Sequence, residues 1–236
     1  MIVDLNDKDF MRRNIDAFYG YISRIVLWNS VCSNPTSTEE QAYETQVSVT
    51  LEEIKETING YLKNDRAEYV DGVCDVVVTA GYLAYMNKDT SMDIDLDHVV
   101  FDREQDILNF GVKVEMTPED VKLVDVFWIF LKAMELIDEK YLHEYMNAVL
   151  DSNDTKILKF PYPYDGQQIK DVLVSELDYV AKKYAGEFTG IVPVQYENDV
   201  NQSQYYVFRA NLGAGKILKP SQYKLPKDFL SEWDKL

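Results

Sequence analysis

Hydrophobic positions that recur every three or four residues dominate the first two-thirds of the chain, a pattern that predicts long amphipathic helices. We expect helices over about residues 7–33, 37–63 and 66–86. Pro35 ends the first of them, and the short polar stretch "LKNDRAE" joins the second to the third. Because a connection that short favours antiparallel neighbours, the pattern predicts an all-α fold built on an antiparallel helical bundle.

The periodicity changes after the third helix. Residues 87–117 are polar and lack a clear period, so we expect an irregular insertion there. Thr117 as N-cap, with Pro118 at the first helical position, begins one long helix or two that end near Leu150. A further helix is expected over residues 168–184, followed by the strand-like runs "QYYVFRA" and "GKILKP". These patterns predict a bundle over residues 1–160, and an extra helix with an irregular, short-stranded C-terminal extension over 161–236.

The third expected helix carries two carboxylates inside an apolar segment, "EYVDGVCDVVVTAGYLAYM". At 100° per residue, Asp71 and Asp75 share a narrow stripe with Tyr82, and Glu68 and Thr79 lie at its margin. An ionised carboxylate is costly to bury unless it is paired, hydrogen-bonded or bound to a metal. The alternative is that the stripe faces water, although a solvated stripe more often carries Lys, Arg or Glu. The composition of the stripe favours a site.

The second expected helix contains three glutamates in "TLEEIKETI". Glu52 and Glu53 precede Glu56 by one turn, so all three can address one point. Alone, this pattern is also ordinary amphipathicity. Beside an antiparallel helix with Asp71 and Asp75, however, the carboxylates would repel one another without a cation. Oxygen donors without His or Cys favour Mg²⁺, or Mn²⁺, and a carboxylate outside the metal shell could orient or deprotonate a water molecule.

Composition and charge limit the classes of ligand and partner that the protein is expected to bind. The chain has 236 residues and a hydrophobic fraction of 46%, enough for a sizeable core. Its net charge of −17 disfavours nucleic acid and anionic membrane surfaces, and an anionic ligand would need a cation or a local Lys/Arg cluster. Two cysteines, an acidic first segment and no run of 18 apolar residues indicate a cytoplasmic, soluble protein.

Several stretches together resemble a known family. "LEEIKE" followed by "DGVCDVVVT" resembles the EExxE…ExxD signature of the all-α nucleoside triphosphate pyrophosphohydrolases, and most closely the phage-type MazG-like proteins. "EYMNAVLDSNDTKI" is similar to the "EVHRSNMSK" segment of that subgroup, and "GKILKPSQYKLPKDF" to its "GKxLKPxxYxxPDL" tail. The resemblance covers residues 40–86, 144–157 and 213–229 in the expected order.

The resemblance implies a MazG-like bundle that hydrolyses a nucleotide between its α and β phosphates with Mg²⁺ and assembles as a dimer or tetramer, in the host cytoplasm if the source is viral. Glu53 and Glu56 would be catalytic. The implied metal ligands are Glu52, Glu53, Glu56, Asp71 and Asp75. The implied substrate-binding residues are Asn153, Lys156, Lys216, Lys219 and Tyr223. Asp71 and Asp75 are four residues apart where the family spacing is three, so a Glu68–Asp71 pair is the alternative.

The chain also departs from the family pattern. No arginine precedes the glutamate motif in "YETQVSVTLEE", and "NAVLD" lacks the His and Arg of "EVHR". About 65 residues separate the third helix from "SNDTK", more than the subgroup usually has. These departures leave two other classes open, a regulatory protein that binds a nucleotide or partner without hydrolysis, and a purely structural assembly protein.

Overall fold

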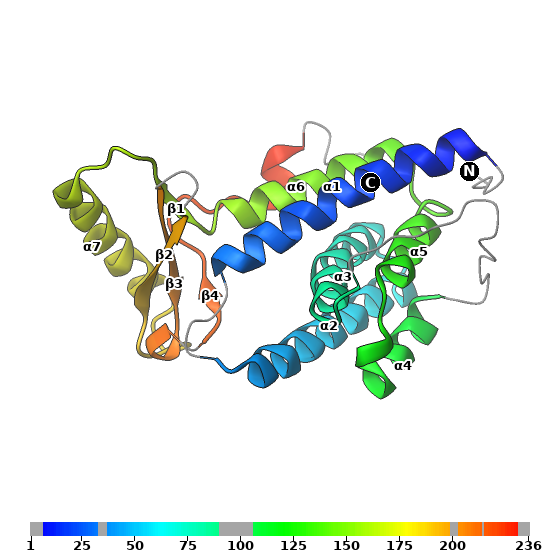
Figure 1. Ribbon diagram of the computed structural model, residues 1–236, viewed down its shortest axis with the longest axis horizontal. Helices are drawn as coiled ribbons and strands as arrows, with labels where there is room; N and C mark the ends of the chain where they lie inside the picture. Colours follow the sequence, from blue (N-terminus) through cyan, green and yellow to red (C-terminus); the bar gives the residue numbers. More distant parts are fainter. Residues whose placement is uncertain (1–6, 33–36, 90–105, 199–202, 214, 231–236) are drawn as a thin grey trace. The chain divides into compact units, whose positions relative to one another are not determined.

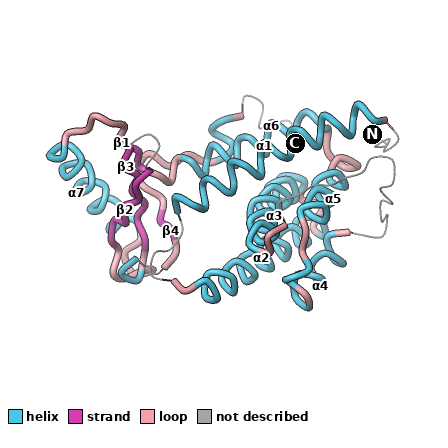
Figure 2. The backbone as a smooth tube through the Cα atoms, viewed as in Figure 1, coloured by secondary structure: helices cyan, strands magenta, loops and turns pink. Residues whose placement is uncertain are grey.

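The computed structural model of the protein describes residues 7–32, 37–89, 106–198, 203–213 and 215–230. Most of these residues are helical, and a small antiparallel sheet accompanies the helices (Figures 1 and 2). The predictions of a helix-dominated protein and of short strands near its C-terminus are therefore confirmed. None of the described helices is long and apolar enough to cross a membrane.

The first three helices lie where the hydrophobic periodicity predicts them. They are α1 (Lys8–Cys32), α2 (Glu39–Leu62) and α3 (Arg66–Met86). Asp65 caps α3, because its carboxylate accepts a hydrogen bond from the amide of Glu68 at 3.1 Å. The polar connection between α2 and α3 is thus a short turn, and the two helices lie side by side in Figure 1.

The segment after α3 differs from the prediction. Residues 107–116 form the helix α4 (Ile107–Met116), which we had expected to be irregular; Asp106 caps it, and Phe110 and Val114 are buried. Residues 90–105 of the expected insertion lie outside the described residues. Pro118 begins a three-residue 3₁₀ helix, η1 (Pro118–Asp120), and not an α-helix, and Thr117 makes no side-chain cap. Exposed apolar residues accompany the buried ones in α4, namely Leu108, Val112 and Met116, so its sequence does not show one clear apolar face.

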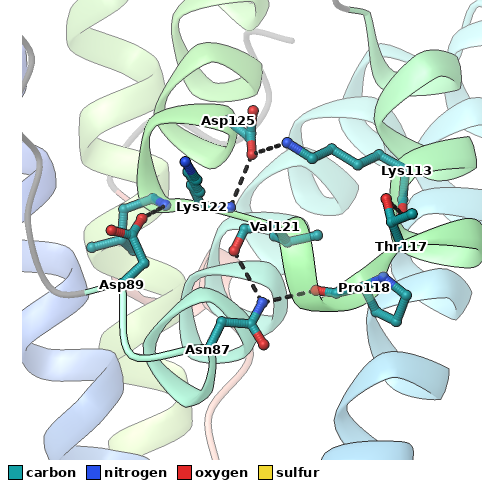
Figure 3. A network of polar contacts seen from close by, with 9 residues as sticks. Asn87, Asp89, Lys113, Thr117, Pro118, Val121, Lys122 and Asp125 are labelled. Atoms are coloured by element: carbon teal, nitrogen blue, oxygen red, sulfur yellow. Dashed lines mark hydrogen bonds and ion pairs between the residues drawn. The ribbon is translucent and has the colours of Figure 1, made fainter.

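Two helices occupy the region from Thr117 to about Leu150, where one or two were predicted, and the helix predicted over residues 168–184 follows them. They are α5 (Leu123–Ala133), α6 (Glu139–Asp154) and α7 (Gly166–Lys183). Side chains around the end of α3 fix the start of α5 (Figure 3). The Asn87 amide donates to the carbonyls of Pro118 and Val121 at 2.8 and 3.0 Å, and Asp89 accepts from the Leu123 amide at 2.8 Å. These bonds hold α5 against α3.

The strands form one antiparallel sheet. They are β1 (Leu158–Phe160), β2 (Val192–Asn198), β3 (Ser203–Arg209) and β4 (Ile217–Leu218). β3 is central: β2 pairs with one edge, and β1 and β4 pair with the other. β3 and β4 coincide with the predicted runs, whereas β1 is a three-residue strand that its own sequence did not reveal.

The chain divides into two compact units. The first comprises residues 1–26, 39–150 and 230–236, and the second residues 27–38 and 151–229. The boundary at residue 150 lies ten residues before the one that the sequence predicts, at residue 160. Each unit has its own core: Phe18, Val77 and Phe127 lie in the first, and in the second apolar residues of α7 pack on the sheet around Val180 and Phe208.

Within the first unit, a partly buried hydrogen-bond network joins α1 to α6. His143 contacts the hydroxyl of Tyr21 through Nδ1 and the side-chain oxygen of Asn14 through Nε2, each at 2.7 Å. The Asn14 amide nitrogen donates to Phe10 and Glu139, so its oxygen must accept, and His143 Nε2 carries the proton. Burial lowers the pKa of His143, which keeps the ring neutral near pH 7. The network fixes the position of α6 on α1.

Candidate functional site

The closest approach between α2 and α3 lies beside the predicted acidic motif. A Cβ atom added to Gly72 would lie 2.5 Å from Oγ1 and 2.9 Å from Cα of Thr57, and one added to Gly60 would lie 2.8 Å from the amide of Tyr69. Only glycine allows the two backbones to come this near. About two turns beyond Gly72 on α3, the carbonyl of Thr79 accepts a hydrogen bond from the Gln46 amide of α2 at 2.7 Å. The two helices are therefore in contact along the whole motif.

The three glutamates of α2 differ in exposure. Glu53 is half-buried, whereas Glu52 and Glu56 are exposed. Thr50 and Thr57, which lie one turn before and one turn after Glu53, are both buried, so Glu53 belongs to the stripe of α2 that faces α3. Among the three, Glu53 is the carboxylate positioned closest to the helix–helix contact.

Both aspartates of α3 are half-buried, and Asp71 has a defined partner. Its Oδ1 accepts a hydrogen bond from the hydroxyl of Tyr145 at 2.8 Å. Tyr145 lies on α6 and is 2% exposed. Burial raises the pKa of the Tyr145 hydroxyl, and the neighbouring Asp71 raises it further, so this hydroxyl remains a donor. The sequence left open the alternative that the stripe of Asp71 and Asp75 faces water. The half-burial of both residues and the bond from Tyr145 argue against that alternative.

Cys74 lies between the two aspartates on the inner side of α3. It is completely buried, and this burial raises the pKa of its thiol well above the ordinary value, with Asp75 and Asp71 adding to the effect. The thiol is thus protonated and inert near neutral pH. Glu68, the alternative partner in the family motif, is exposed in the first turn of α3. Of Glu68 and Asp71, Asp71 is the one that is half-buried and accepts a hydrogen bond from α6.

The five predicted metal ligands have the chemistry that a hard divalent cation requires. All are carboxylates, they lie on two adjacent helices, and Tyr145 orients one of them, Asp71. Within the described residues, however, no three or more His, Cys, Asp or Glu side chains are gathered as a group that could hold a metal ion. The joint role of Glu52, Glu53, Glu56, Asp71 and Asp75 in metal binding stays a prediction.

In the second unit, the structure brings together most of the predicted substrate-binding residues. Nζ of Lys219 lies 4.5 Å from the ring centroid of Tyr223, and Nζ of Lys156 lies 6.0 Å from the same centroid. Lys156 also donates to Oδ1 of Asn153 at 2.6 Å. We call Asn153, Lys156, Lys219 and Tyr223 the basic–aromatic group. Lys216, the fifth predicted residue, is exposed and does not join this group in the described part of the chain.

Hydrogen bonds between two distant segments build the basic–aromatic group. Ser152, at the end of α6, donates to the carbonyl of Lys224 at 2.7 Å and lies 3.2 Å from the hydroxyl of Tyr223. The Lys224 amide donates to Oγ1 of Thr155 at 3.1 Å. These contacts dock the C-terminal segment onto residues 152–157. Ser152 and Thr155 thus have a role in shaping the group that their sequence positions did not reveal.

Trp28 is a further member that sequence reasoning missed. Its indole nitrogen donates to the carbonyl of Asn153 at 3.0 Å, and Nζ of Lys156 lies 5.9 Å from its ring centroid. Trp28 stands near the end of α1, far from the other members in sequence, and no local pattern around it marks a site. Two ammonium groups and two aromatic rings therefore adjoin one another in the second unit, a combination suited to an anion that carries a ring.

No family model, curated protein or solved structure matches this chain.

Proposed function

We propose that this protein is a Mg²⁺-dependent nucleoside triphosphate pyrophosphohydrolase with a MazG-like helical bundle. It would cleave a nucleotide between the α and β phosphates and release the monophosphate and pyrophosphate. The observation that supports this most is the placement of Glu53, Asp71 and Asp75, which are half-buried on two helices in contact, with Asp71 oriented by Tyr145. The resemblance of the motifs in "LEEIKE", "DGVCDVVVT" and "GKILKPSQYKLPKDF" supplies the reaction type.

The proposal gives each acidic residue a role. Glu52, Glu56, Asp71 and Asp75 would hold the cation, which when bound offsets the negative charge of the phosphates. Glu53 would align the attacking water molecule and accept its proton, because it lies on the α2 stripe that faces α3. Tyr145 acts as a positioning residue that fixes the carboxylate of Asp71.

The basic–aromatic group would bind the substrate. Lys156 and Lys219 would neutralise phosphate oxygens, and the rings of Tyr223 and Trp28 offer faces on which a nucleobase can stack. A chain with a net charge of −17 needs such local cations in order to hold an anionic ligand. By the same resemblance, we propose a homodimer or homotetramer that acts in the cytoplasm.

Release of pyrophosphate from a panel of ribo- and deoxyribonucleoside triphosphates, with and without Mg²⁺ or Mn²⁺, tests the proposal. We expect metal-dependent release, reduced on the order of 100-fold or more in Asp75→Asn, because a lost ligand costs at least as much as a lost outer-shell partner. Glu44→Gln is the matched control: Glu44 is an exposed acid on α2 outside the motif, and this variant should retain full activity.

Two results would count against the proposal. Nucleotide binding without any product, under either metal, would favour the regulatory binding protein that the departures from the family pattern left open. Full activity of a folded Asp75→Asn protein would show that the assigned acidic site does not carry out the reaction. Thermal melting of both variants, recorded in parallel, separates a lost site from a lost fold.

A further inference from the structure

The first unit contains a cavity of about 370 Å³ that the proposed function does not use. It is bounded by the C-terminal end of α2, the first half of α3, the start of α4 and the end of α5. Twelve residues line it: Ile58, Tyr61, Leu62, Tyr69, Val73, Asp106, Ile107, Leu108, Ile129, Lys132, Glu135 and Leu136. The volume falls within the range of cavities that bind small molecules, about 300–1,000 Å³.

The cavity is separate from the acidic residues. None of Glu52, Glu53, Glu56, Asp71 and Asp75 lines it. Val73, which does, is two residues from Asp71 on α3, and two residues correspond to about 200° around a helix. Asp71 accordingly contacts Tyr145 of α6, whereas Val73 meets the cavity together with Ile129 of α5. A ligand in the cavity would therefore occupy the other side of α3.

The walls of the cavity are suited to a ring. Its floor is aliphatic and closed, with Val73 and Ile129 only 1% and 3% exposed. The rings of Tyr61 and Tyr69 stand together at one wall, with centroids 5.8 Å apart and an interplanar angle of 53°. Exposed leucines form the rim, at positions 62, 108 and 136. Aromatic side chains beside aliphatic ones bind flat, apolar bodies by contact with both the faces and the edges of the ring.

The charged groups at the cavity disfavour an anion. Asp106 and Glu135 are carboxylates, and Lys132 is the single cation among the lining residues, with its Nζ 3.6 Å from Glu135. Asp106 is engaged by the amides that begin α4. Burial raises the pKa of Tyr69 to about 12, with Tyr61 and Glu135 adding to it, so its hydroxyl stays neutral and can donate a hydrogen bond. The lining thus has a net charge of −1.

We propose that this cavity is a second ligand site, which binds a small aromatic compound that is uncharged or carries one positive charge. The tyrosine faces would attract a cationic substituent, and the two carboxylates would complement it. Such a ligand differs from a nucleoside triphosphate in charge, and the inference stands whether or not the chain hydrolyses nucleotides.

Three probes with one ring system test the charge preference on the full chain: indole, tryptamine as the cation and indole-3-acetate as the anion. Ligand-detected saturation-transfer NMR and calorimetry measure the binding. We expect saturable binding of indole and tryptamine, and a dissociation constant for indole-3-acetate at least about threefold higher than that for indole, because of like-charge repulsion at the lining. Indole-3-acetate that binds as tightly as indole overturns the charge preference.

Rim variants test the location. Leu62→Asp and Leu136→Asp place a charge at the mouth of the cavity, and both leucines are exposed, so the fold should persist. We expect each to weaken indole binding about tenfold, because an apolar ring would then meet a solvated carboxylate. Val174→Asp, at an exposed position of α7, is the matched control and should bind indole normally. Unchanged binding in both rim variants, or no saturable binding by the unaltered chain, overturns the proposal.

Discussion

The acidic helices of the first unit and the basic–aromatic group of the second are built in different ways. In α2 and α3, regular helix geometry places the acids, and packing at Gly72 and Thr57 brings the helices together. In the second unit, side-chain hydrogen bonds of Ser152 and Thr155 to a C-terminal segment place the lysines and rings. The first arrangement depends on backbone contact, whereas the second depends on a docked segment.

This difference indicates where each region is vulnerable. A helix pair in close contact tolerates changes on its outer face but not at its contact points, because packed interiors leave no room for an added atom. A docked segment held by a few side-chain hydrogen bonds loses its geometry in small steps, each worth about 1 kcal/mol.

Gly72→Ala should have the largest effect. The new methyl group would lie 2.9 Å from Cα of Thr57, which cannot move without separating α2 from α3. We expect a loss of about 3 kcal/mol in the free energy of unfolding, measured by urea denaturation. Gly20→Ala is the control, since Gly20 is exposed on α1 and has nothing within 4 Å; it should gain up to about 1 kcal/mol from helix propensity. Equal stability of the two variants would mean that α2 and α3 are not in close contact.

Tyr145→Phe should come next. It removes the hydrogen bond to Asp71 and leaves a half-buried carboxylate without that donor, so we expect a loss of about 2 kcal/mol. Tyr141→Phe on the same helix is the matched control, because the buried hydroxyl of Tyr141 has no hydrogen-bond partner among the described residues and its removal should cost nothing. Thermal and urea denaturation of the pair measure the difference. If Tyr141→Phe lowers the free energy of unfolding as much as Tyr145→Phe does, the hydrogen bond from Tyr145 does not fix the orientation of Asp71.

Lys219→Met should change the stability of the fold least. Its effect should instead be weaker binding of an anionic ligand. We expect the dissociation constant for inorganic pyrophosphate to rise about fivefold, the size of a single partly exposed charge interaction, and the loss to shrink at high salt. Lys183→Met is the matched control: Lys183 also lies over tyrosine rings in the second unit, 5.5 Å from those of Tyr179 and Tyr184, but outside the group. Similar losses in both variants would contradict a specific site.

The parts of the fold that could be predicted are those in which one helix face is clearly apolar. The limits of α1, α2 and α3 follow from their hydrophobic periodicity and from the short polar connection "LKNDRAE" between α2 and α3. α4 escaped prediction because Leu108, Val112 and Met116 leave apolar residues on its outer face as well, so its period is blurred. β1 escaped because three residues are too few to show alternation, and its pairing with β3 is a long-range contact.

The candidate site shows the same limit. The acids on α2 and α3 could be proposed from spacing, but the hydrogen bond to Asp71 comes from Tyr145 on α6, about 70 residues later in the sequence. The resemblance indicated Asn153, Lys156, Lys219 and Tyr223, whereas Trp28 joins them only through the fold. Local sequence determines which residues share a helix face, and tertiary packing determines what that face meets.

The central claim is that the acids of α2 and α3 share a divalent cation. Titration of the full chain with Mn²⁺, followed by the loss of the free-ion signal in electron paramagnetic resonance, tests this without requiring turnover. We predict saturable binding that Glu44→Gln retains and that the folded double variant Glu53→Gln/Asp75→Asn loses. Equal Mn²⁺ affinity in the double variant, or no saturable binding by the unaltered chain, would contradict the claim.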